Sequence, residues 1–167
     1  MQIVLALAAL LVLVQDKDDP RYKYWSSCKV GSWVKTRMSM DQGGVQFEMD
    51  QVQKLIDIAD DKVTLEISGT RKFNGKELPM PPRKQDIRAK YKEGDVLIEK
   101  EGDEEIEVAG KKFKCHWLEL TTRNGPNPGK MKAWMTEEVP GGVIKAEITP
   151  PNNPVPLVMT AVEWEKK

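Results

Sequence analysis

Apolar and polar residues alternate with a period of two through most of the chain beyond residue 32. In segment 33–40, Val34, Thr36, Met38 and Met40 fall on one face, and the residues between them fall on the other. Successive side chains of a strand point to opposite faces, so this alternation predicts a half-buried β-strand. Similar alternation in segments 63–68, 113–118, 131–136, 143–148 and 157–164 predicts further strands.

Turn residues separate several of these segments. Asp60-Asp61 and Ala109-Gly110 each stand between two alternating runs, which predicts two hairpins. Pro140-Gly141 has the order of a type II turn, because glycine tolerates the positive φ that the third turn position requires.

Two segments are less regular. Segment 74–84 contains Pro79, Pro81 and Pro82, which cannot donate to a sheet ladder, so it is expected to be a loop. Segment 51–59 is expected to be a strand with Val52, Ile56 and Ile58 on one face. No segment of the chain after residue 15 is expected to be helical.

The pattern predicts an all-β fold of about eight or nine strands. Strands that are neighbours in sequence usually pair, so antiparallel order is expected. Because closure or coverage protects the edges of a sheet, we expect a strongly curved antiparallel sheet or an open half-barrel.

An unbroken apolar run covers residues 3–14. Twelve residues are too few to cross a hydrocarbon core of about 30 Å as a helix, whereas they suit a secretory signal. We therefore expect a signal peptide at 1–15, a polar linker at 16–24 and a single β domain at 25–167, exported to the periplasm or the extracellular space with no stable membrane span after cleavage. An uncleaved membrane anchor and a buried N-terminal strand are the alternatives for this run.

The charges balance, with 26 basic and 26 acidic residues. No basic excess is present to bind a phosphate backbone, so nucleic acid is not an expected partner. The two cysteines, Cys28 and Cys115, are compatible with a disulfide in an oxidising compartment and equally with two separate buried thiols.

Catalytic chemistry has little support in the sequence. His116 is the only histidine, no Gly-x-Ser-x-Gly motif is present, and the alternation points His116 away from Phe113 and Cys115. We therefore expect no catalytic residue, no metal site and no cofactor. A weaker alternative is an enzyme that acts on cell-wall or carbohydrate substrates through a pair of the abundant carboxylates.

Methionine is frequent along the predicted strands. Its flexible side chain fills irregular cores and also suits surfaces that accept apolar ligands of varied shape. The residues predicted to contact such a ligand are Met38, Met40, Trp117, Met135 and Met159.

Two segments carry a family resemblance. Residues 107–115, EVAGKKFKC, and residues 134–145, WMTEEVPGGVIK, resemble small exported β-rich proteins of unknown function from planctomycete-like bacteria. The order of elements is also similar to the half-barrel of outer-membrane lipoprotein-sorting carriers. Those carriers add helices that plug the half-barrel, and the pattern of this chain predicts none. The resemblance implies a fold and transfers no catalytic residue.

Together these observations predict a non-enzymatic β domain of the cell envelope that binds a hydrophobic or lipid-like ligand. The alternative is a structural or protein-interaction module of an envelope assembly, which would pair with an envelope protein through an exposed strand edge.

Overall fold

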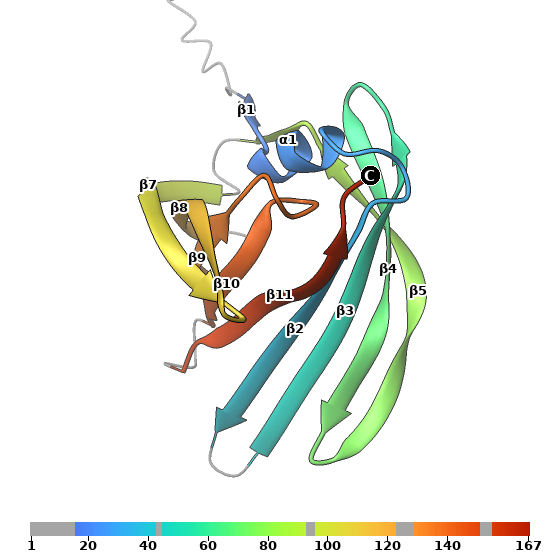
Figure 1. The fold of residues 1–167 in the computed structure, drawn as a ribbon, viewed down its shortest axis with the longest axis vertical. Coiled ribbons are helices and arrows are strands. Elements are labelled where there is room, and N and C mark those ends of the chain that lie inside the picture. Colours follow the sequence, from blue (N-terminus) through green and yellow to red (C-terminus); the bar gives the residue numbers. More distant parts are fainter. Residues whose placement is uncertain (1–15, 43–44, 93–95, 123–128, 151–154) are drawn as a thin grey trace, which may run out of the picture.

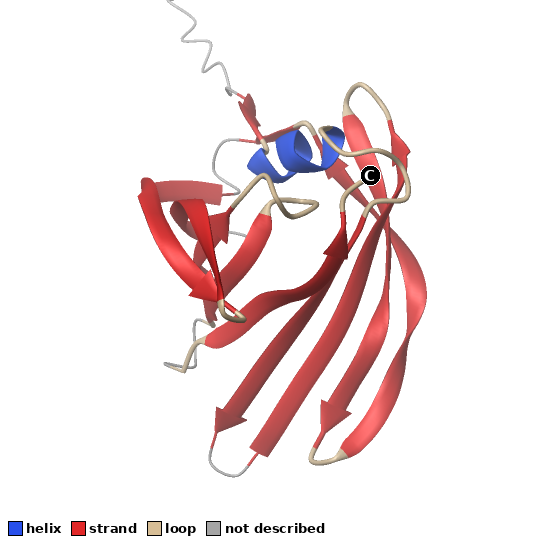
Figure 2. Cartoon of the chain, in the orientation of Figure 1, coloured by secondary structure: helices blue, strands red, loops and turns tan. Residues whose placement is uncertain are grey.

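The computed structural model describes residues 16–42, 45–92, 96–122, 129–150 and 155–167. The signal peptide expected at 1–15 therefore lies outside the described residues. The described residues form a nine-stranded antiparallel sheet with the order β5-β4-β3-β2-β11-β10-β9-β8-β7, a two-stranded pair of β1 and β6, and one helix, α1 (Figures 1 and 2). The elements are β1 Asp16–Asp18, α1 Pro20–Ser26, β2 Trp33–Gln42, β3 Val45–Ile58, β4 Lys62–Phe73, β5 Lys76–Arg88, β6 Lys90–Lys92, β7 Val96–Val108, β8 Lys111–Thr122, β9 Gly129–Met135, β10 Val143–Thr149 and β11 Leu157–Glu165.

The all-β prediction is confirmed, and so are the predicted turns. The β7–β8 hairpin turns through Ala109 and Gly110, with φ of 51° and 78°, and positive φ at both central residues matches the twist of the strands that a two-residue turn joins. The Pro140-Gly141 turn is closed by the backbone N–H of Gly142, which donates to the carbonyl oxygen of Val139 at 2.9 Å.

Two meanders, β2–β5 and β7–β11, meet where β2 pairs with β11. The edge strands β5 and β7 are joined by a short segment, since Val96 follows Arg88 by eight residues. Such a segment spans at most about 29 Å, whereas the edges of a flat nine-stranded sheet would lie about 38 Å apart. The sheet must therefore curve, and the open, curved architecture that we predicted is the one observed.

The helix α1 corrects the expectation that no helix follows residue 15. Asp19 caps it by accepting a hydrogen bond from the backbone N–H of Arg21 at 2.9 Å, and Pro20 occupies the first turn. Trp25 is only 2% exposed, so the helix is anchored in the core. In Figure 1, α1 lies at one end of the sheet, close to the C-terminus.

The region expected to be a polar linker, residues 16–24, contains β1 and most of α1. Its backbone is tied to the sheet, because the N–H of Asp19 donates to the carbonyl oxygen of Ala89 at 2.8 Å.

The expected loop at 74–84 is also corrected, because most of it belongs to β5. Pro79 lies opposite Thr70, and the register skips Pro81 and Pro82 at a bulge. β5 is an edge strand with one neighbour, β4. Edge strands and bulges are the places in a sheet that tolerate proline, since the missing N–H there would pair with nothing.

The face predicted for β3 is wrong. Val52 lies opposite Lys35 and Ser68, whereas Leu55, which is fully buried, lies opposite Leu65. A bulge between Leu55 and Asp57 interrupts the alternation, so a single period does not describe the whole strand.

Candidate functional site

One face of the sheet carries apolar side chains in two rows that run across the strands. Residues that pair across antiparallel strands project to the same face, so the register defines each row. The first apolar row consists of Ile98, Leu120, Met131, Ile148, Leu157, Met40, Phe47 and Phe73, and it ends on β5 at the charged residue Lys76, which pairs with Phe73. Leu157 and Met40 share this row because they lie two residues from the pair Met159 and Met38. The second apolar row consists of Leu118, Ala133, Ala146, Met159, Met38, Met49, Arg71 and Leu78, and it ends on β7 at the charged residue Glu101, which pairs with Leu118.

The two rows differ from the buried core in their access to solvent. Ile98 is 36% exposed, Leu78 is 44% exposed and Phe73 is 50% exposed. Most of the other members are half-buried, with Leu118, Ala133 and Ala146 buried. Large apolar side chains that gather on one exposed face are typical of surfaces that bind apolar partners.

The face is concave, because one cavity is lined by residues from both meanders. The cavity has a volume of about 190 Å³ and contacts Leu65 of β4, Met131 of β9 and Trp25 of α1. Four members of the apolar rows also line it, namely Met131, Ala133, Ala146 and Met159. The rows therefore lead into a partly open cavity between the sheet and α1.

The wall of this cavity is mainly apolar, with a few polar groups. Thr36 donates through Oγ1 to the carbonyl oxygen of Gln51 at 3.5 Å, and Arg21 is held by a two-point ion pair with Asp19. Gln53 and Gln85 also contact the cavity. A mostly apolar concavity with a few polar groups is the usual form of a ligand site.

The structure brings together three of the five residues predicted to contact a ligand. Met159 lines the cavity and belongs to the second row together with Met38, and Met40 belongs to the first row. Met135 pairs with Val143 next to the cavity but is only 3% exposed, so it packs in the interior.

Trp117 lies on the opposite face of the sheet from these methionines. It pairs with Trp134, whereas the next residue, Leu118, pairs with Ala133 of the second row. Lys132 Nζ lies 4.5 Å from the ring centre of Trp117 and 4.7 Å from that of Trp134. Trp134 also donates through Nε1 to Glu104. Both tryptophan rings are therefore already in contact with side chains of the protein itself.

The residues of this face that sequence reasoning missed are Met49, Phe47, Phe73 and Met131. Phe47 and Met49 of β3 alternate with polar residues as Met38 and Met40 of β2 do, and they pair with Met40 and Met38. That signal was present in the sequence.

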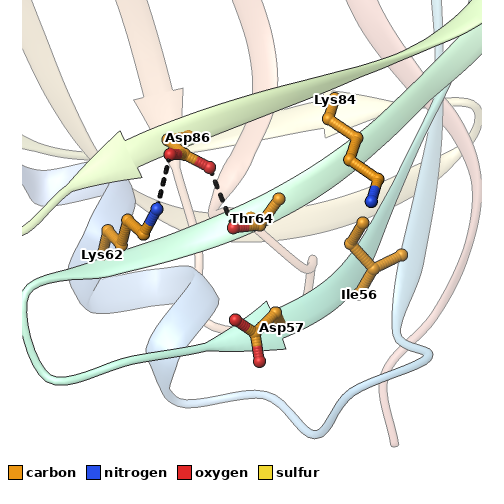
Figure 3. Close-up of a pocket in the computed structure, with 6 residues that line it drawn as sticks. All are labelled: Ile56, Asp57, Lys62, Thr64, Lys84 and Asp86. Carbon is orange, nitrogen blue, oxygen red and sulfur yellow. Dashed lines mark hydrogen bonds and ion pairs between the residues drawn. The ribbon is translucent and has the colours of Figure 1, made fainter.

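A wider hollow of about 740 Å³ lies on the outer face of β3–β5, and Figure 3 shows its lining. Asp86 accepts from Lys62 Nζ at 2.8 Å and from Thr64 Oγ1 at 2.8 Å. These contacts hold the pKa of Asp86 below its usual value, the bond from Lys62 contributing most. Lys62, Thr64 and Asp86 of this exposed hollow thus satisfy one another.

Charged pairs cover the outer face elsewhere as well. The Arg37 guanidinium makes two hydrogen bonds to the carboxylate of Asp50, at 2.7 and 2.8 Å. The pKa of Asp50 is lowered, first by these bonds and also by the nearby charge of Lys35. On β2–β5 the outer face therefore carries cross-strand ion pairs, in contrast to the apolar rows. On β8 and β9 the same face carries Trp117 and Trp134.

His116 is half-buried and lies between two carboxylates. Its Nδ1 is 2.9 Å from Asp103 Oδ1, and its Nε2 is 3.5 Å from Glu101 Oε2. In the described part of the chain no group of three or more His, Cys, Asp or Glu side chains is arranged to hold a metal ion.

The cysteines are both buried as free thiols in the structure. Each is 4% exposed, and Cys28 Sγ lies 3.3 Å from the carbonyl oxygen of Tyr24. Burial raises the pKa of Cys115 to about 11, with a smaller contribution from Glu104 and Glu138.

No protein-family model, curated protein or solved structure matches this chain. The similarity to lipoprotein-sorting carriers stays a prediction. Among the helices of the described residues, none has the length and apolar character needed to cross a membrane.

Proposed function

We propose that the protein is a non-enzymatic binding domain of the cell envelope that holds an acyl chain against the concave face of its sheet. The observation that carries this proposal is the continuity of the two apolar rows with the cavity beneath α1. The location outside the cytoplasm is part of the proposal and rests on the apolar segment at 3–14.

The size of the hydrophobic effect supports an acyl chain as the ligand. Each buried methylene contributes about 0.8 kcal/mol, so burial of about ten methylenes contributes about 8 kcal/mol. That corresponds to a dissociation constant of about 1 µM before the costs of association are subtracted. The methionines add to this, because their unbranched side chains adapt to a flexible chain.

The cavity and the charge distribution favour binding over catalysis. Of the described residues, those that line the cavity include Arg21, already paired with Asp19, and no carboxylate. The carboxylates with a lowered pKa, such as Asp50 and Asp86, are on the outer face in ion pairs. Perturbed acids inside a cleft would be expected of an enzyme.

The test compares two neighbouring residues on opposite faces of β2. Met38→Glu places a carboxylate in the second apolar row between Met49 and Met159. Ser39→Glu adds the same charge on the outer face. We expect Met38→Glu to weaken the binding of a fluorescent acyl probe at least tenfold, because a charge is costly on an apolar face, and Ser39→Glu to change it less than twofold.

Native mass spectrometry and lipid extraction of the purified wild-type protein would identify a co-purifying acyl compound. Circular dichroism of both variants checks that they fold. A folded wild-type protein that takes up no acyl probe would contradict the proposal. It would favour the alternative of an interaction module, for which the edge strand β7, with β8 as its one neighbour, offers a partner site.

A further inference from the structure

We infer that the acyl ligand is a long-chain carboxylate whose head group binds Arg71 and whose tail enters the cavity beneath α1. This inference rests on the proposed function and adds the charge of the ligand and its direction across the sheet.

Arg71 is the charged residue that lies within the second apolar row, between Met49 and Leu78. The other charged residues that the register aligns with the rows lie on the edge strands: Glu101 of β7, opposite Leu118, and Lys76 of β5, opposite Phe73.

The guanidinium of Arg71 makes no salt bridge within the described residues. Residues that pair across the sheet give it no carboxylate to bind. On the outer face, in contrast, Arg37 pairs with Asp50 and Lys62 pairs with Asp86.

The Arg71 guanidinium therefore has no carboxylate partner among the described residues and lies beside apolar side chains. An arginine fork matches a carboxylate with two parallel hydrogen bonds. Such a bond is strengthened where the surroundings are apolar and water is partly excluded. A ligand with an anionic head group and an apolar tail would pair with the Arg71 guanidinium and cover the apolar row beside it.

The second row leads from Arg71 to the cavity. After Arg71 on β4, the row crosses Met49 on β3 and Met38 on β2 and reaches Met159 on β11, which lines the cavity. Three strand spacings separate Arg71 from Met159, or about 14 Å along the sheet. One leaflet of a hydrocarbon core about 30 Å thick gives a similar length for an acyl chain, about 15 Å.

The cavity also indicates how many chains are bound. Its volume of about 190 Å³ is below the range of about 300–1,000 Å³ that is usual for pockets that enclose whole drug-sized ligands. It suits the end of one chain, with the rest of that chain lying along the second row. A free fatty acid is therefore favoured over a diacyl phospholipid.

The test uses a fluorescent polyene fatty acid and its methyl ester, which differ in charge at the head group. We expect the wild-type protein to bind the acid at least tenfold more tightly than the ester. Arg71→Gln should remove this preference by weakening acid binding, and should leave ester binding within about twofold. High salt should weaken binding of the acid and leave binding of the ester unchanged.

The matched control is Lys72→Gln, which removes the same charge from the adjacent residue on the outer face of β4, opposite Glu48 and Glu77. The preference should persist in this variant. A second variant, Arg83→Gln, removes another cation of the concave face, which lies opposite Ile67. If Arg83→Gln removes the preference and Arg71→Gln does not, the assignment of the head group to Arg71 is wrong.

The remaining outcomes separate this inference from the proposed function. Equal binding of acid and ester by the wild-type protein would overturn the inference and leave acyl binding intact. Binding of neither compound by the folded protein would overturn the proposed function itself. Displacement of the probe by phosphatidylglycerol at lower concentration than by unlabelled fatty acid would show that the ligand is a diacyl lipid and that the inference is wrong.

Discussion

Gly141 is the residue at which backbone conformation and core packing depend most directly on each other. Its φ is 75°, and a Cβ atom added there would overlap the indole ring of Trp25. We expect Gly141→Val to lower the free energy of unfolding by about 1–3 kcal/mol through backbone strain, with a further loss from displacement of Trp25. Urea denaturation of the variant and the wild-type protein measures this difference.

The control for Gly141 is His116→Ala. The His116 side chain is 41% exposed and its contacts are with the exposed carboxylates of Glu101 and Asp103. Partly exposed ion pairs contribute little, so we expect a change within about 0.5 kcal/mol. If His116→Ala unfolds the domain while Gly141→Val leaves it unchanged, the assignments of both the turn and the partly exposed histidine are wrong.

Asp50 gives the protein a stability contribution that depends on pH. The pKa of Asp50 is lowered in the folded chain, first by the hydrogen bonds from Arg37. The folded state therefore binds fewer protons than the unfolded state near pH 4. The contribution is present above the unfolded pKa of about 3.9 and is lost as the pH falls through the folded pKa.

We therefore expect Asp50→Asn to be less stable than the wild-type protein at pH 7 by up to about 1 kcal/mol, because the Arg37 side chain is 53% exposed and the pair is screened by solvent. The difference should shrink as the pH falls below 4. Urea denaturation at pH 7, 4 and 3 measures it. Glu48→Gln, which removes an outward carboxylate that forms no salt bridge among the described residues, is the control. A difference between Asp50→Asn and wild type that stays constant with pH would refute the explanation.

At the scale of elements, alternation predicts strands well and boundaries poorly. The hairpin turns and the face of β2 follow from local chemistry, because a wrong turn residue or a wrong face has an immediate cost. The helix α1 has seven residues, too few for the helical period to be read. The signals that were available are the capping residue Asp19 followed by Pro20.

The strand β5 could not be predicted from its own sequence. Prolines argue against a central strand, and the residues of this segment do not show that it lies at the edge of the sheet. Only the pairing with β4, with Pro81 and Pro82 at a bulge, makes the prolines acceptable. The prolines in the sequence argue against a strand here, and only the position of β5 at the sheet edge makes a strand possible.

The candidate site can be predicted from the sequence only in part, because some of its residues are brought together by strand pairing. Met38 and Met40 follow from alternation within β2. Arg71 belongs to the site through its register with Met49, which depends on the pairing of β3 with β4. Residue type alone predicts Trp117 beside the methionines, whereas its pairing with Trp134 puts it on the other face.

At the scale of the whole molecule, one core joins both meanders. The buried cluster contains Val34 and Leu65 of the first meander together with Phe113 and Ile144 of the second, with Trp25 of α1 packed among them. The curvature that brings the meanders together also creates the cavity. Ligand binding on the concave face is therefore expected to stabilise the folded chain as a whole, since the unfolded chain has no such face.

The two thiols report on opening of this shared core. Cys28 follows α1, Cys115 lies on β8, and both belong to the buried cluster. Because burial raises the pKa of Cys115 to about 11, its thiol stays protonated and unreactive at pH 8.

We expect Ellman's reagent to detect no thiol in the native protein at pH 8 and two per chain in urea. Cys28→Ser and Cys115→Ser should each leave one thiol in urea. Rapid reaction of the native protein would contradict a common core, whereas no thiol in urea without a reductant would show that the cysteines form a disulfide.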